Sequence, residues 1–207
     1  MTVSSIDRDA QLLFWPEHSS ILRPAIQVAA AEGRRVSGMA RNIEIKARVD
    51  DLAAVRAKAQ LLSASEPETL VQHDTFYRTP TGRLKLREFA DGSAELIYYE
   101  RPDQPGPKTS TYTRTPVPEP RSMDELLRRL SGQLDVVTKR REIFLVGSTR
   151  IHLDNVDGLG SFVELEVVLS PEQTEADGEA IAADLIGKLG IQRDALVAGA
   201  YVDLLRR

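Results

Sequence analysis

The chain has 207 residues, of which 42% are hydrophobic and 28% charged, so it can bury a core and is not an intrinsically disordered chain. The formal charge of −4 provides no global basic field for nucleic acid, and the absence of cysteine excludes disulfides, thiolate metal sites and cysteine nucleophiles. No apolar run approaches the roughly 20 residues of a membrane span, and the first 30 residues lack the apolar centre of a signal peptide, so we expect a cytoplasmic protein without a membrane partner.

Residues 1–38 differ from the rest of the sequence. They contain the only tryptophan, show no sustained periodicity and end in the polar run EGRRVSG. Patterned sequence begins at Met39. We expect residues 1–38 to be a flexible appendage or an upstream extension without a catalytic role, and residues 39–207 to form one folded domain.

The first patterned segment, residues 42–49, alternates with the period of a β-strand. Its apolar face consists of Ile43, Ile45, Ala47 and Val49. Its polar face consists of Asn42, Glu44, Lys46 and Arg48. A helix follows over about residues 51–62, capped by Asp50 or Asp51, because apolar residues then recur at helical spacing.

The next segments favour strands. The predicted strands cover residues 74–78, 82–88, 94–101 and about 110–117. The Asp91-Gly92 pair indicates a hairpin turn between the second and the third of them. Long strands joined by hairpins predict a mostly antiparallel sheet.

The second half begins with a predicted helix at about 123–131, with Ser122 and Glu125 as its capping box. The patterns then predict strands at 136–146, 150–156 and 161–169. Ser170-Pro171, with Gln173 completing a second capping box, predicts a helix start. Helical periodicity resumes over about 179–189, and a short helix is expected over 194–205. The fold class is therefore α+β, with helices packed outside the sheet.

Charges on the polar strand faces are sorted by sign. Arg83, Lys85 and Arg87 lie on one face at steps of about 7 Å, whereas Glu164 and Glu166 share a face of another strand. Like charges so close are unfavourable unless something neutralises them. One interpretation is a set of solvated surface faces. The other is a barrel whose lumen binds a divalent cation and a polyphosphate.

The charged strands resemble four motifs of the CYTH family, also called triphosphate tunnel metalloenzymes. NIEIKARV resembles its ExExK signature, GRLKLRE its basic second motif, and VTKRREIFLVG its V-x-K-x-R segment. RIHLDNVDGLGSFVELEVVL resembles the specific LD-x-V-x-GLG-x-F-x-E-x-E ending, and the match covers residues 39–207. Among subfamilies, the chain is most similar to bacterial class IV adenylyl cyclases. This resemblance implies an eight-stranded antiparallel β-barrel, or tunnel, with flanking helices.

The resemblance also implies site residues and a cofactor, Mg²⁺ or Mn²⁺. The implied metal-site carboxylates are Glu44, Glu164 and Glu166, with Asp154 beside them. The implied catalytic set is Glu44, Lys46 and Glu166. The implied triphosphate-binding residues are Lys46, Arg48, Lys85, Arg87, Arg101, Lys139 and Arg141. Two departures stand out: Asn42 replaces the first glutamate of the signature, and Arg101 in YYERP stands near the position of a lysine in relatives.

The sequence leaves the reaction open. A cyclase would convert ATP to cyclic AMP and pyrophosphate, and a hydrolase would use the same residues on tripolyphosphate, thiamine triphosphate or a nucleotide. A polyphosphate-binding module without catalysis is a third possibility, because Asn42 removes one negative charge from the expected metal site. A nucleic-acid binder is disfavoured, because aromatic residues do not alternate with the basic ones. Whether the chain forms a homodimer, as some relatives do, also stays open.

Overall fold

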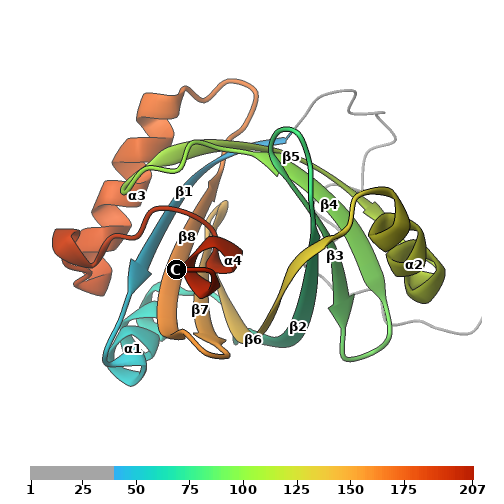
Figure 1. Cartoon of the computed structure of the whole chain (residues 1–207). Coiled ribbons are helices and arrows are strands. Elements are labelled where there is room, and N and C mark those ends of the chain that lie inside the picture. Colours follow the sequence, from blue (N-terminus) through green and yellow to red (C-terminus); the bar gives the residue numbers. More distant parts are fainter. Residues whose placement is uncertain (1–39) are drawn as a thin grey trace, which may run out of the picture. The chain divides into compact units, whose positions relative to one another are not determined.

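The computed structural model describes residues 40–207, so the expected appendage at residues 1–38 lies outside the described residues. Eight antiparallel strands within residues 40–207 form a closed barrel in the order β1-β5-β4-β3-β2-β6-β7-β8 (Figure 1). The strands are β1 (Ala40–Arg48), β2 (Glu68–Tyr77), β3 (Arg83–Phe89), β4 (Ala94–Glu100), β5 (Lys108–Pro116), β6 (Gln133–Val146), β7 (Thr149–Val156) and β8 (Gly160–Val168). The predicted α+β barrel is confirmed.

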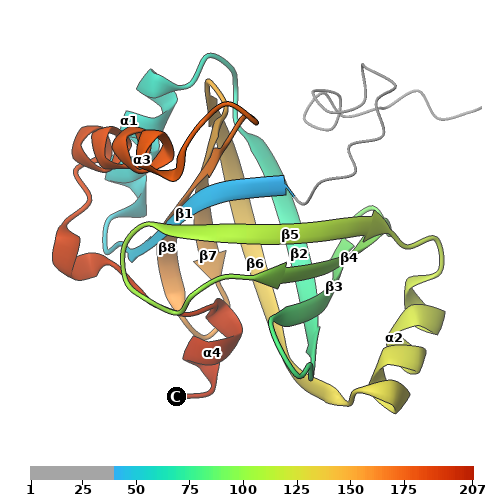
Figure 2. The ribbon, with the colours of Figure 1, turned by 90° about the horizontal axis from the view of Figure 1, so that it is seen from above.

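Helices cover the outside of the barrel and one of its ends. They are α1 (Leu52–Leu62), α2 (Pro120–Leu130), α3 (Glu175–Leu189) and α4 (Tyr201–Leu205), with a short 3₁₀ turn, η2 (Arg193–Ala195). Figures 1 and 2 show α1 and α3 together on one side of the barrel and α2 on the opposite side, next to β3. Both views place α4 at one opening. No helix among residues 40–207 has the length and apolar character needed to cross a membrane.

The main apolar core lies between the barrel wall and the helices, not inside the barrel. Ile43 and Ile45 on β1 and Leu165 on β8 point outward and are at most 1% exposed. They pack with Leu185 and Leu189 of α3 in one cluster. Burying each such side chain contributes about 1.5–3 kcal/mol. The alternation therefore leaves the polar side chains of the same strands facing the lumen.

A smaller apolar cluster closes around the end of the barrel where α4 lies. Phe76, Val137, Val156 and Phe162 pack there with Tyr201, the first residue of α4. The rings of Phe162 and Tyr201 meet edge to face with centroids 5.0 Å apart. These contacts place Tyr201 at the boundary between the apolar cluster and the charged lumen.

Strand β2 starts at Glu68, whereas the sequence pattern predicted a strand over residues 74–78. The missed half contains Val71, which is 47% exposed, and Gln72, which is 2% exposed. In this half of the strand the polar side chain is buried and the apolar side chain is exposed, because the interior of this barrel is polar. A search for apolar residues facing a core therefore overlooks this half of the strand.

Both predicted capping boxes lie at the wrong residues. Helix α2 begins one turn earlier, with Pro120 as its first residue, and Ser122 contacts the Glu119 side chain instead. At the second site, the Gln173 side chain accepts a bond from the Ser170 amide and closes a turn.

The helix after that turn, α3, is capped by Thr174 and Asp177. The helix expected over 194–205 forms only in its second half, as α4, because Gly199, with φ of 83°, separates η2 from α4.

Candidate functional site

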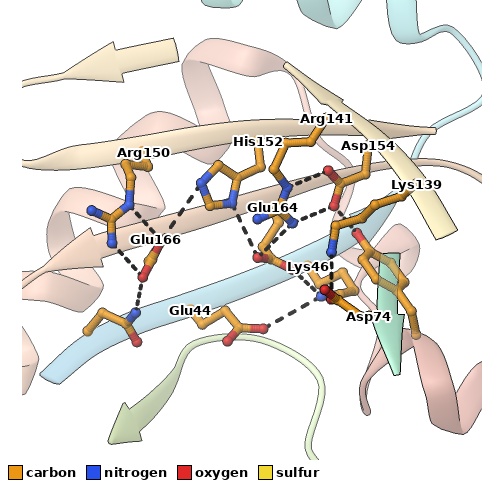
Figure 3. A network of polar contacts seen from close by, with 12 residues as sticks. Glu44, Lys46, Asp74, Lys139, Arg141, Arg150, His152, Asp154, Glu164 and Glu166 are labelled. Carbon is orange, nitrogen blue, oxygen red and sulfur yellow. Dashed lines mark hydrogen bonds and ion pairs between the residues drawn. The ribbon is translucent and has the colours of Figure 1, made fainter. Parts of the chain in front are cut away.

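Strands β1 and β8 bring acidic and basic side chains into the lumen side by side. Their register pairs Glu44 with Glu166 and Lys46 with Glu164, and residues directly opposite in an antiparallel pair share a face. Side chains of β6 and β7 face the same space, and Figure 3 shows them converging on these carboxylates. The predicted sorting of charge is therefore a property of the lumen.

The Glu164 carboxylate contacts basic side chains from three other strands. Its carboxylate pairs closely with the Lys46 ammonium, and the other oxygen lies 3.3 Å from Arg141 Nη2 and 3.3 Å from His152 Nδ1. Burial favours the neutral acid, but Lys46 and Arg141 outweigh it and hold the pKa of Glu164 well below its usual range. Glu164 is therefore an anion between cations.

Glu166 lies further along β8 and has a different set of partners. Arg150 of β7 donates to it from Nε at 2.8 Å and pairs from Nη2 at 2.7 Å. Asn42 donates from Nδ2 to the same carboxylate. Burial would raise the pKa of Glu166, but the bond from Arg150 and its charge lower this pKa to about 2.

The Asn42 amide is only half satisfied. Its side chain is buried, and its Oδ1 has no hydrogen-bond partner among the described residues. A buried carbonyl oxygen without a partner is costly, typically about 1–3 kcal/mol. This oxygen lies beside Glu166 and is of the type that divalent cations such as Mg²⁺ accept as a ligand.

Asp74 on β2 is the centre of the basic wall. Its carboxylate accepts two bonds from Arg87, Nε–Oδ1 and Nη2–Oδ2, both of 2.7 Å. Lys85 donates to Oδ2 at 2.8 Å and Lys139 at 3.5 Å. Asp74 is 1% exposed, and although burial would raise its pKa, Arg87, Lys85 and Lys139 hold that pKa well below its usual range. One carboxylate therefore holds three basic side chains in place.

A second paired group lies where the lumen meets α4. Arg141 donates to both oxygens of Asp154 at 2.6 Å, and the Tyr201 hydroxyl donates to Asp154 Oδ2 at 2.7 Å. The Lys46 and Lys139 ammonium groups lie 4.1 and 5.3 Å from the centre of the Tyr201 ring. Both oxygens of Asp154 are occupied by these partners, as are those of Glu164 and Glu166, and Asp154 holds Arg141 in place.

Two further buried cations line the lumen. The Arg101 side chain is 2% exposed, and its Nε lies 3.6 Å from Glu44, yet Nε and Nη1 have no hydrogen-bond partner among the described residues. Lys108, opposite Glu44 in the β1–β5 register, is 2% exposed and donates to the Gln104 carbonyl at 3.1 Å. Burial, with Arg101 next, lowers the pKa of Lys108 to about 8.

The structure brings together most, but not all, of the residues singled out in the sequence. The side chains that meet in the lumen network are Glu44, Lys46, Lys85, Arg87, Arg101, Lys139, Arg141, Asp154, Glu164 and Glu166. Arg48 is separate from them: it is exposed, donates to the Leu159 carbonyl at 2.6 Å and lies over the Phe162 ring.

Sequence reasoning missed Asp74, Lys108 and Tyr201. A lone aspartate in a strand has no local signal, and only the pairing of β2 with β3 and β6 brings Asp74 to its cations. Lys108 is the first residue of β5, a strand that was predicted to begin later. Only the alignment of β5 with β1, which places Lys108 opposite Glu44, indicates that it belongs to the site. Tyr201 enters the lumen from a terminal helix that strand patterns do not describe.

The lumen is not a preformed metal cage. Among residues 40–207, no three Asp, Glu or His side chains are already arranged as ligands of one ion. Glu164 and Glu166 are instead bound to Lys46, Arg141 and Arg150. A divalent cation would have to compete with these side chains, and a triphosphate would supply the replacement anions for them.

Comparisons with known proteins agree with this geometry. The chain is 25% identical over 170 residues to the adenylate cyclase CyaB of Aeromonas hydrophila, covering 77% of this chain and 85% of that protein. The PH1012 protein of Pyrococcus horikoshii OT3 has a solved structure with TM-score 0.72 and 26% identity, covering 79% and 99% of the two chains.

A putative adenylyl cyclase from Hippeastrum, HpAC1, shares the fold with TM-score 0.59 and 17% identity, over 80% and 95% of the two chains. That structure is described as revealing a dominant triphosphatase activity. The model of the CYTH domain matches residues 40–201, which include every strand of the barrel. The chain belongs to the CYTH family.

Proposed function

We propose that this protein is a metal-dependent enzyme that binds a triphosphate inside the barrel and converts ATP to cyclic AMP and pyrophosphate. The observation that carries the proposal is the lumen itself, in which Glu44, Glu164 and Glu166 share a wall and buried cations face them. A largely buried set of paired charges has little structural use, because burying ion pairs rarely adds net stability. It suits a ligand that carries both a metal ion and phosphates.

The side chains present fit Mg²⁺ or Mn²⁺. Glu166 and Glu164 have lowered pKa values and are therefore ionised oxygen donors at neutral pH. The Asn42 Oδ1 atom is buried without a hydrogen-bond partner beside Glu166, which a cation would satisfy. Glu44, Glu164, Glu166 and Asn42 are the residues that would hold the ion. When bound, the metal would screen the phosphates and polarise an attacking hydroxyl or water.

The basic residues would hold the phosphate chain. Lys85, Arg87 and Lys139 are already gathered at one point by Asp74, so little ordering entropy remains to be lost when phosphates arrive. Arg101 has two buried nitrogen atoms without a hydrogen bond and can donate to a phosphate oxygen. These preorganised donors would stabilise the negative charge that develops on a leaving pyrophosphate.

In the cyclase reaction, the ribose 3′-oxygen forms a bond to the α-phosphorus and the bond to the pyrophosphate oxygen breaks. The hydroxyl proton is released, and the pyrophosphate carries the charge that the Lys and Arg side chains stabilise. Support for this reaction over others is the similarity to the adenylate cyclase CyaB of Aeromonas hydrophila.

A second candidate is hydrolysis of the triphosphate, including tripolyphosphate or thiamine triphosphate. Two observations favour it: the dominant triphosphatase activity stated for HpAC1, and Asn42 in place of an acidic residue at the expected metal site. In this reaction, water attacks the terminal phosphorus, the bond from that phosphorus to the bridging oxygen breaks, and the diphosphate part leaves as phosphate is formed, while the same side chains hold the substrate.

The test is one set of incubations with ATP, thiamine triphosphate or tripolyphosphate, each with Mg²⁺, Mn²⁺ or a chelator, in which cyclic AMP, pyrophosphate and phosphate are all quantified. We expect cyclic AMP and pyrophosphate in equal amounts from ATP, only with metal. Phosphate without cyclic AMP would assign the hydrolase instead. Binding of all three compounds without any product would overturn the proposal of an enzyme.

A further inference from the structure

Arg150 lies at the rim of the barrel, because it is the second residue of β7, next to the turn that follows β6. Figure 3 shows it at one end of the lumen network, with Asp154 toward the other. The register of β7 and β8 places Arg150 opposite Glu166. Its Nε and Nη2 atoms contact the two oxygens of that carboxylate at 2.8 and 2.7 Å. Such two-point pairs are the strongest contacts between a guanidinium and a carboxylate.

Glu166 is surrounded by donors as long as Arg150 stays. Asn42 Nδ2 donates to it at 2.5 Å, and His152 Nε2 lies 3.7 Å away. A divalent cation bound to this carboxylate would meet the guanidinium at close range. Two cations repel each other strongly where protein side chains replace water. The metal ion and Arg150 are therefore competitors for Glu166.

The basic side chains that contact Glu164 are anchored at other groups as well. Arg141 binds Asp154 through two bonds of 2.6 Å, and a longer contact of 3.3 Å reaches Glu164. Lys46 also faces Glu44 at 3.6 Å. The side chains of Arg141 and Lys46 are 7% and 3% exposed. Moving either of them would leave an unpaired charge in the buried part of the lumen.

Arg150 differs from these two side chains in its exposure and in its anionic partners. Its side chain is 29% exposed, and Glu166 is the only carboxylate within ion-pair distance of it among residues 40–207. Tyr112 of β5 is a further polar neighbour. A long basic side chain at an opening can turn its charged end to water while its stem stays in contact with the protein. Arg150 can therefore leave its carboxylate at a lower cost than Arg141 or Lys46 can.

The oxygen atoms around Glu166 suit the ion that would replace Arg150. Glu44 lies opposite Glu166 in the β1–β8 register, and its two ion-pair contacts of 3.6 Å are longer than hydrogen bonds. Asn42 Oδ1 is buried beside Glu166 and has no hydrogen-bond partner within residues 40–207. Carboxylate and amide oxygens are the ligands that Mg²⁺ and Mn²⁺ prefer.

We propose that Arg150 is the exchangeable counter-ion of Glu166: it neutralises this carboxylate in the metal-free lumen, and a divalent cation binds by taking its place. The inference rests on the proposed function, because it assumes that Glu166 is a metal ligand. It adds a residue that sets the affinity for the metal without binding it. Competition from Arg150 weakens the binding of the free ion. An ion that arrives with a triphosphate brings phosphate oxygens as further ligands, so Arg150 favours the joint binding of both.

The first test measures Mn²⁺ binding to Arg150→Gln by electron paramagnetic resonance, without any phosphate compound. Arg140→Gln is the matched control, because Arg140 is exposed on β6 and its replacement removes the same charge. We expect the dissociation constant for Mn²⁺ to fall by roughly tenfold or more in Arg150→Gln, and to stay unchanged in the control. Unchanged or weaker binding in Arg150→Gln would overturn the proposal.

Arg150→Lys provides a second variant if glutamine disturbs folding, which thermal unfolding will reveal. Lysine keeps the charge but cannot form the two-point pair with Glu166, so it competes less well with the metal. Mn²⁺ should therefore still bind more tightly to Arg150→Lys than to the unaltered protein. Equal affinities of these two proteins would count against the exchange.

The second test uses the unaltered protein. An arginine-specific dicarbonyl reagent modifies accessible guanidinium groups, and mass spectrometry of the peptides quantifies Arg150 and Arg140 separately. Saturating Mn²⁺ should speed the modification of Arg150, because its guanidinium is released from Glu166, and should leave that of Arg140 unchanged. Equal or slower modification of Arg150 in the presence of Mn²⁺ would show that the ion does not displace it.

Mn²⁺ titrations with tripolyphosphate separate a failure of this proposal from a failure of the proposed function. If Mn²⁺ binds to the unaltered protein with tripolyphosphate, but Arg150→Gln does not tighten the binding of the free ion, the role of Arg150 fails while the metal site stands. If neither protein binds Mn²⁺, alone or with tripolyphosphate, the proposed metal-dependent function fails and the exchange at Glu166 fails with it.

Discussion

Asp74 and Arg87 face each other across the β2–β3 pair and are joined by two parallel bonds of 2.7 Å inside the barrel. Lys85 and Lys139 reach the same carboxylate. This one acidic side chain therefore does in the free protein what phosphate oxygens would do in the complex: it holds the cations together and compensates their charge. The basic wall is thus prepared before the ligand arrives.

Asp74→Asn should destabilise the protein and increase its dependence on the ligand. Removing one partner from a buried charge pair costs about 3–5 kcal/mol, because the other charges remain buried. Tripolyphosphate should then raise the melting temperature of Asp74→Asn more than that of the unaltered protein. The matched control is Asp184→Asn, which removes an exposed pair with Lys188 and should cost well under about 1 kcal/mol. Equal stability of Asp74→Asn and the control would contradict this role of Asp74.

The affinity for triphosphate should fall above pH 8. Burial lowers the pKa of Lys85 to about 8, with repulsion from Arg87 adding to it and Asp74 opposing it. Lys85 is therefore charged below pH 8 and loses its proton as the pH rises through this value, well before an ordinary lysine at about 10.4. Calorimetry with tripolyphosphate between pH 6.5 and 9.5, without metal, measures the effect.

Lys85→Arg is the control for this pH dependence, because arginine stays charged throughout the range. It should retain more of its affinity at the alkaline end than the unaltered protein does. Part of the fall will remain, since burial and Arg101 lower the pKa of Lys108 to about 8, and burial and Arg141 lower the pKa of Lys139 well below its usual range. An affinity that stays constant up to pH 9.5 in the unaltered protein would contradict the combination of a lowered pKa of Lys85 and its contact with the phosphates.

Asn42→Glu should tighten the binding of Mn²⁺. The amide now donates to Glu166, and a carboxylate there would instead place two anions side by side. A divalent cation compensates such a pair, so its affinity should rise by about tenfold. Titration of Mn²⁺ followed by electron paramagnetic resonance measures this without requiring turnover. An unchanged affinity would exclude position 42 from the metal site.

Tyr201→Phe and Tyr201→Ala should separate the hydroxyl from the ring. Phenylalanine removes the bond to Asp154, which keeps both bonds from Arg141, so the loss of stability should be about 1 kcal/mol. Alanine also removes the ring beneath Lys46 and Lys139, and buried aromatic-to-alanine changes cost about 3–5 kcal/mol. Urea unfolding measures the loss of stability in both variants. Equal losses would show that the ring of Tyr201 adds no stability beyond that of its hydroxyl.

The sequence predicted most of the strands because alternation along each strand is a local property, whereas the resemblance to the CYTH family implied their closure into an eight-stranded barrel. The common face of Arg83, Lys85 and Arg87 follows from their spacing alone, and so does that of Glu164 and Glu166. Strand β2 was detected only in part, since Gln72 is buried and Val71 exposed, the reverse of the usual arrangement around an apolar core. Local patterns identify strands well where the buried face is also the apolar one.

The rest of the site depends on contacts that are distant in sequence. The capping boxes predicted at Ser122 and Ser170 met the local rule, but better start sites at Pro120 and Thr174 lay close by. Asp74 has no neighbour in sequence that signals its role, because its three cations come from two other strands. The partners of such a residue follow only from the order and register of the strands.

The most direct test of the account is metal-dependent turnover of ATP and tripolyphosphate by Glu44→Gln and Glu166→Gln. Both changes keep the shape of the side chain and remove the charge of a proposed metal ligand. Glu179→Gln, on the exposed face of α3, is the control, and circular dichroism with thermal unfolding verifies the fold. We expect both lumen variants to remain folded and to lose nearly all turnover, while the control retains it. Folded lumen variants with full metal-dependent activity would contradict the assignment of the barrel lumen as the active site.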